Sequence, residues 1–246
     1  METPAPKPAL PLEPTLRDHD GQGHHRAAET ADITECWDPA ALAGRLVEIT
    51  SGPALGPRAT PVLRVPAIPS IWDIAPARRD AGSAALTSAA SLLWKAQQRG
   101  EPAAWISARG STFFPPDLEA GGIDLAALVV VRAVDASAAA RAADKLLRSG
   151  AFGLVVLDLG AHAAVPTPLL GRLLGLAQKH QAAVVFLTEK AADAPSLAPI
   201  VSLRVAASRR RVAAGRFACT IEATKDKRRA PGWTSEETFR GPPGLR

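Results

Sequence analysis

The clearest hydrophobic pattern in the chain is a short apolar run that ends in one carboxylate, Leu154-Val155-Val156-Leu157-Asp158. Polar residues do not alternate with the apolar ones, which indicates a strand buried on both faces, as in the middle of a parallel sheet. An Asp at the carboxyl end of such a strand stands where open α/β sheets bind ligands. The pattern therefore predicts a central strand and makes Asp158 the first candidate site residue.

Apolar runs and segments with helical spacing alternate along most of the chain. The predicted strands are 46–50, 103–107, 128–131, 154–158 and 183–188, and the predicted helices are 81–100, 136–150 and 167–180, with short helices after Asp38 and at 116–120. This alternation predicts right-handed βαβ units and a mostly parallel sheet flanked by helices. Near the C-terminus, 202–207 and 216–223 lie on either side of Gly215 and predict an antiparallel hairpin.

Two segments depart from this pattern. Residues 1–31 are rich in Pro, Gly, His and charged side chains, and we predict a disordered N-terminal tail. Residues 53–80 contain six prolines, which are incompatible with a helix interior or a central strand. We therefore predict one α/β domain at 32–246 that is interrupted by a Pro-rich insertion at 53–80.

The positive charge of the chain is concentrated at its C-terminal end. Residues 199–246 hold 11 of the 29 Lys and Arg residues but only 4 of the 24 Asp and Glu residues. Such asymmetry favours an anionic partner, with nucleic acid as the first candidate. The basic residues form two groups, Arg209, Arg210 and Arg211 near the predicted hairpin turn, and Lys225, Lys227, Arg228 and Arg229 after the second strand. We expect both groups to contact DNA or a protein partner.

The two cysteines, Cys36 and Cys219, are far apart in sequence and have no metal-ligand spacing, so we predict free thiols and no metal site. No apolar run approaches the length of about 18–20 residues that a membrane span needs. The sequence therefore predicts a cytoplasmic protein without membrane contact.

Several ordered segments resemble the core of RecA-type ATPases. They are 44–50, 103–108, 123–131 and 148–158, together with Thr224-Lys225-Asp226-Lys227, which is similar to the Lys-x-Lys segment near the end of that core. Within this group, Phe113-Phe114-Pro115-Pro116-Asp117-Leu118 and the terminal Gly241-Pro242-Pro243-Gly244-Leu245 look more like ImuA-type proteins than RecA itself. The resemblance implies a RecA-like core, and in such ATPases the Asp at the position of Asp158 orients a magnesium ion.

The residues that ATP hydrolysis needs are mostly replaced. A phosphate loop requires GxxxxGK[ST], in which backbone N–H groups and a Lys hold the phosphates. The nearest match, Gly82-Ser83-Ala84-Ala85-Leu86-Thr87, has Ala85 in place of the Lys. Arg109 stands near the position of the catalytic Glu, and Glu189 replaces a polar sensor. Gly82, Thr87 and Asp158 are thus predicted to be remnants of a nucleotide site. We expect no catalytic residue and no cofactor. The alternative for the cofactor is ATP with magnesium.

The resemblance implies an accessory protein of the DNA-damage (SOS) response that is associated with the nucleoid when engaged. Its expected partners are a Y-family-like polymerase subunit, an error-prone replicative-type polymerase and RecA, in translesion synthesis or in restraint of recombination. Three alternatives stay open. They are a divergent RecA-type ATPase, a SulA-like inhibitor of cell division, and a simple DNA-binding module.

Overall fold

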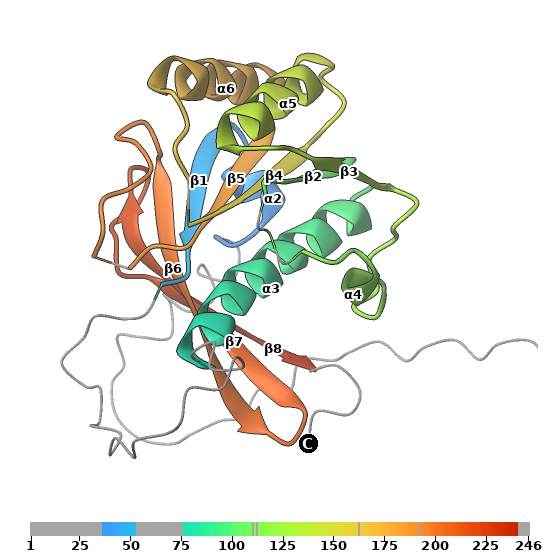
Figure 1. Cartoon of the computed structure of the whole chain (residues 1–246), viewed down its shortest axis with the longest axis vertical. Helices are drawn as coiled ribbons and strands as arrows, with labels where there is room; N and C mark the ends of the chain where they lie inside the picture. Colours follow the sequence, from blue (N-terminus) through green and yellow to red (C-terminus); the bar gives the residue numbers. More distant parts are fainter. Residues whose placement is uncertain are drawn as a thin grey trace, which may run out of the picture.

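The computed structural model describes residues 36–52 and 76–240, with gaps at 110, 112, 162 and 192 (Figure 1). The predicted tail at 1–31 and residues 53–75 of the predicted insertion lie outside the described residues, as do the terminal residues 241–246.

The described residues form one eight-stranded sheet in the order β3-β2-β4-β5-β1-β6-β7-β8. The strands are β1 (Arg45–Thr50), β2 (Ala103–Ser107), β3 (Leu128–Arg132), β4 (Leu154–Gly160), β5 (Ala183–Thr188), β6 (Leu203–Ala213), β7 (Arg216–Asp226) and β8 (Thr234–Arg240). All pairs from β3 to β6 are parallel, whereas β7 and β8 are antiparallel to their neighbours. The predicted α/β class, with a mostly parallel sheet and a C-terminal antiparallel hairpin, is confirmed.

Helices cover both faces of the parallel part of the sheet. They are α2 (Pro39–Leu42), α3 (Pro76–Gln98), α4 (Pro116–Glu119), α5 (Ala136–Arg148) and α6 (Thr167–His180). The central strand β4 shows why both faces are needed, because its successive side chains point to opposite sides. Leu154 and Val156 belong to the core on the α3 side, whereas Val155 and Leu157 belong to the core under α5 and α6 (Figure 1).

Helix α3 and strand β8 differ from the sequence prediction. Helix α3 begins at Pro76, so that the last five residues of the predicted insertion are helical. Proline is compatible with the first turn of a helix, because the N–H that it lacks has no partner there. The second difference is strand β8, which the sequence analysis did not predict. Its exposed and half-buried residues alternate, but few of them are apolar, so the hydrophobic pattern gives no signal.

A buried carboxylate stands in the middle of β1. The Glu48 side chain is fully buried. It accepts hydrogen bonds from Thr188 Oγ1 at 3.0 Å, Lys190 Nζ at 3.2 Å, Ser196 Oγ at 3.0 Å and Leu197 N at 2.7 Å. The Arg204 guanidinium on β6 lies 3.6 Å away and adds a second cation. This network ties the segment between β5 and β6 to the central strand of the sheet.

A second ion pair fixes the base of the C-terminal hairpin. Arg45, at the start of β1, contacts Asp226, at the end of β7, at 2.5 Å, and both side chains are buried. Burial alone would raise the pKa of Asp226, but hydrogen bonds from Arg228 N, Arg45 and Trp233 and the charge of Arg45 together lower it. The carboxylate therefore stays ionised and holds β7 against the amino end of β1.

We expect Glu48→Ala to lower the free energy of unfolding by about 3–5 kcal/mol, because it leaves buried donors and two cations without their shared acceptor. Urea denaturation at neutral pH measures this loss. The matched control is Glu222→Ala, which removes an exposed carboxylate from β7 and is expected to change stability by about 0.5 kcal/mol or less. Equal effects of the two substitutions would contradict a structural role for the Glu48 network.

Candidate functional site

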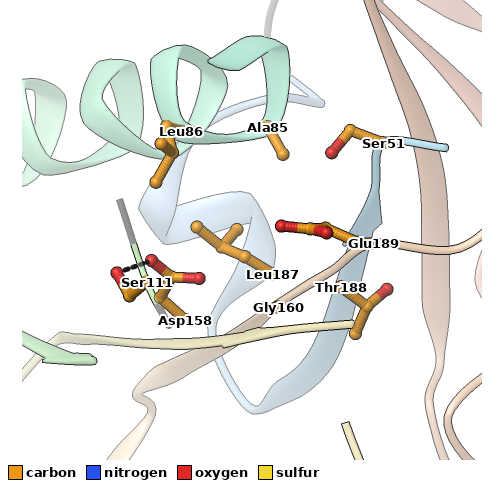
Figure 2. Close-up of a pocket in the computed structure, with 9 residues that line it drawn as sticks. All are labelled: Ser51, Ala85, Leu86, Ser111, Asp158, Gly160, Leu187, Thr188 and Glu189. Atoms are coloured by element: carbon orange, nitrogen blue, oxygen red, sulfur yellow. Dashed lines mark hydrogen bonds between the residues drawn. The ribbon is translucent and has the colours of Figure 1, made fainter. Parts of the chain in front are cut away.

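A small cavity lies where the carboxyl ends of β1, β4 and β5 meet α3 (Figure 2). Its lining residues are Ser51, Ala85, Leu86, Ser111, Asp158, Gly160, Leu187, Thr188 and Glu189. Parallel strands all end at the same edge of a sheet, which is the edge where open α/β folds bind ligands. The structure thus brings Asp158, Ala85 and Glu189 together as the sequence predicted, and adds Ser111 from the loop after β2.

Asp158 is buried at this edge, and its surroundings disfavour its charge. Ser111 Oγ donates a short hydrogen bond to Asp158 Oδ2 (Figure 2). Burial raises the pKa of the Asp158 carboxyl and the charge of Glu189 raises it further, whereas Ser111, the Gly160 backbone and Arg132 act in the opposite direction; the net result is a raised pKa. A carboxyl in this state is a weaker ligand for a cation than an exposed carboxylate.

The size and charge of the cavity oppose a nucleotide. Its volume of about 20 Å³ is room for about one water molecule, whereas ligand pockets usually measure about 300–1,000 Å³. The side chain of Leu187 lies in the middle of the group, and Glu189 points inward below Ala85 (Figure 2). Among the described residues that line the cavity there are two carboxylates and neither Lys nor Arg.

The segment predicted as a remnant phosphate loop is part of a continuous helix. Gly82 is the seventh residue of α3, and only the first four N–H groups of a helix are free to bind an anion. Ala85 and Leu86 face the cavity, but the Thr87 hydroxyl is hydrogen-bonded to the Cys219 thiol on β7. Of the three predicted remnants Gly82, Thr87 and Asp158, the structure places Asp158 in the cavity and directs Thr87 away from it.

Arg109 and Ser111 both follow β2, but only Ser111 lines the cavity. Arg109 is exposed in the turn after β2 and is not part of the cavity wall. Ser111, two residues later, occupies the place beside Asp158. No sequence pattern pointed to Ser111, because residues 108–115 have no regular hydrophobic periodicity.

The predicted basic residues separate into two groups. Arg209, Arg210 and Arg211 lie within β6, close to the turn, because the strand continues six residues beyond the predicted 202–207. Lys225 lies near the end of β7, and Lys227, Arg228 and Arg229 follow it. Phe217, which pairs with Arg211, and Lys225 are separated by about 25 Å along the strand. The two groups therefore do not form one continuous basic surface.

The group at the base of the hairpin is engaged within the chain. Lys225 Nζ donates to Pro199 O at 3.2 Å, and the Arg228 guanidinium donates to Ala43 O at 3.2 Å. Burial lowers the pKa of Lys225, and the charge of Lys227 lowers it further. Lys227–Arg229 lie at the amino end of the sheet, opposite the cavity, because Lys227 N donates to Ser202 O beside the start of β1.

Comparison with known proteins adds no family assignment. No protein-family model matches the chain, and no curated protein is significantly similar to it. Within the described part of the chain, no group of three or more His, Cys, Asp or Glu side chains could hold a metal ion. In the same part, no helix has the length and apolar character needed to cross a bilayer.

We expect Asp158→Asn to raise the free energy of unfolding at pH 7 by about 0.5–2 kcal/mol, because it removes a charge from an unfavourable buried position. In the folded protein the pKa of Asp158 lies above its ordinary 3.8. Below pH 3.8 the carboxyl is neutral in both the folded and the unfolded protein, so burial of Asp158 costs no charge-related stability there. The cost appears as the pH rises through the folded-state pKa. The stabilisation should therefore shrink as the pH falls toward 3.8. Urea denaturation between pH 3.8 and pH 7 measures this change in stability, with the exposed Asp193→Asn as control. A variant Asp158→Asn that is less stable than the unchanged protein at pH 7 would refute the prediction.

Proposed function

We propose that this protein is a non-catalytic, RecA-like accessory protein of the DNA-damage response that acts through protein contacts. The observation that supports the proposal is the small cavity at the carboxyl edge, which Ala85, Leu187 and Glu189 help to line and which has room for about one water molecule. On this proposal, a RecA-like body with so small a cavity acts by binding rather than by turnover.

The connectivity supports the RecA-like part of the proposal. Strand β1 leads toward α3, and β1 is separated from β4 only by β5. A phosphate loop after β1 and an Asp after β4 would therefore meet at one site. Ala85 and Asp158 line the same cavity, which agrees with descent from a phosphate-loop ATPase.

The open edge of the sheet offers a surface for a RecA-type partner. Strand β3 is the first strand of the sheet and pairs only with β2 among the described strands. Val129 and Val130 are 41% and 36% exposed, and Phe114 and Val134 are exposed as well. An apolar edge strand with free backbone groups can accept an extended segment of another protein. Contact of this kind would let the protein cap RecA or join the polymerase subunits of translesion synthesis.

Titration calorimetry with ATP and magnesium tests the non-catalytic part. We expect no saturable binding up to about 1 mM nucleotide, because enzyme sites usually saturate below that concentration. An active RecA-type ATPase serves as the positive control. Saturable, magnesium-dependent binding that is lost in Asp158→Asn would contradict the proposal and favour a divergent ATPase.

Affinity capture with purified RecA tests the contact. We expect Val130→Lys to weaken capture by about tenfold, because it places a charge against an apolar interface. The matched control is Val212→Lys, which changes a valine of similar exposure (41%) on β6, away from the β3 edge. No capture of RecA by the unchanged protein, together with no inhibition of RecA-driven strand exchange, would reject RecA as the partner.

A further inference from the structure

The end of the C-terminal hairpin carries five arginines. Arg209, Arg210 and Arg211 lie on β6, Arg216 begins β7, and Arg240 ends β8. The sequence from 205 to 221 contains neither Asp nor Glu. The hairpin extends beyond the helices at one end of the molecule (Figure 1). We call these five residues the arginine tip.

The strand register distributes these arginines over both faces of the hairpin. Residues that are directly opposite in an antiparallel pair share a face. Arg209 and Arg211 pair with Cys219 and Phe217, so they share the face that packs toward α3. Arg210 pairs with Ala218 and therefore lies on the opposite face. Arg216 and Arg240 are paired with each other on that same opposite face.

The five arginines differ in their local partners. Arg209 lies over the Phe217 ring at 4.8 Å, and Arg210 contacts Glu236 at 2.9 Å. Within the described part of the chain, neither Arg216 nor Arg240 forms an ion pair. Like charges directly opposite each other in a sheet are destabilising, and an anion bound between them removes that repulsion. The pair is therefore a candidate position for a bound anion.

The surrounding face has the chemistry of a phosphate-contacting surface. Ser208, Thr220, Thr234 and Thr238 share the face with Arg216 and Arg240, by the register of β6, β7 and β8. Arg and hydroxyl side chains are common donors to nucleic-acid phosphates. Two carboxylates, Glu222 and Glu236, lie farther from the turn, and Glu236 is held by Arg210 and Thr220. Val212 is the one large apolar side chain exposed at this end of the described chain.

We propose that the arginine tip binds the phosphate backbone of duplex nucleic acid without regard to sequence. The turn is Ala214-Gly215, it follows the small residue Ala213, and β8 ends beside it at Arg240, so three strands meet at the tip. A duplex carries phosphates along both sides of its major groove, which is about 12 Å wide. Arginines on both faces match this geometry, whereas an acidic patch on a protein would present charge to one face only.

Fluorescence anisotropy with a labelled DNA duplex of arbitrary sequence tests the proposal. The tip variant Arg211→Ala/Arg216→Ala/Arg240→Ala leaves the contacts of Arg209 and Arg210 intact. We expect it to bind at least about tenfold more weakly and to reduce the slope of log affinity against log salt by about 3, one for each lost phosphate contact. The corresponding triple substitution to Lys should keep most of the salt slope, since it keeps the charge.

The charge-matched control is Arg141→Ala/Lys145→Ala/Lys179→Ala, which removes three exposed cations from α5 and α6. Equal weakening by the tip and control variants would overturn the proposal, because binding would then follow net charge alone. Polyglutamate that competes as strongly as DNA would overturn it in favour of an acidic protein partner. These assays contain neither RecA nor a polymerase, so their outcome is independent of the proposed accessory function.

Discussion

The carboxylate of Glu48 is buried in the middle of β1. A charge in the middle of a central strand must be matched by donors, because water cannot reach it. Lys190 and Arg204 supply the cations, and Arg204 in turn donates to the carbonyl groups of Ala191 and Ala194. The segment between β5 and β6 is therefore folded around β1. Thr50 Oγ1 also donates to Lys190 O at 2.6 Å, which places Glu189 at the mouth of the cavity.

The two buried carboxylates differ in how well their surroundings stabilise a negative charge. Glu48 has four hydrogen-bond donors and two cations around it. Asp158 has one hydroxyl, one backbone N–H and the charge of Glu189 as its main neighbours, and burial raises its pKa. The first arrangement stabilises a charge and the second opposes one.

The hydrophobic pattern predicts where most strands and helices lie, but it does not predict which side chains from distant segments come into contact. Strand β4 was predictable because its apolar run is continuous, and Asp158 followed from its place at the end of that run. The role of Glu48 was not predicted, although a lone Glu in a buried strand signals a need for donors; its partners lie some 140–155 residues away in sequence. Thr87 was assigned to the cavity from spacing alone, but the phase of α3 directs it to Cys219. The pairing of Arg216 with Arg240 required the register of β8, a strand that the pattern does not reveal.

The two proposed contact surfaces lie at opposite ends of one sheet. The β3 edge begins the strand order and the arginine tip ends it, and seven strand spacings of about 4.8 Å separate β3 from β8 by about 34 Å. A partner protein at one edge and a nucleic-acid duplex at the other can therefore bind without steric conflict. The continuous hydrogen-bonded sheet between them keeps their distance fixed, which a flexible linker cannot do. Under the two proposals, the sheet acts as a rigid spacer that sets the distance between the protein contact and the nucleic-acid contact.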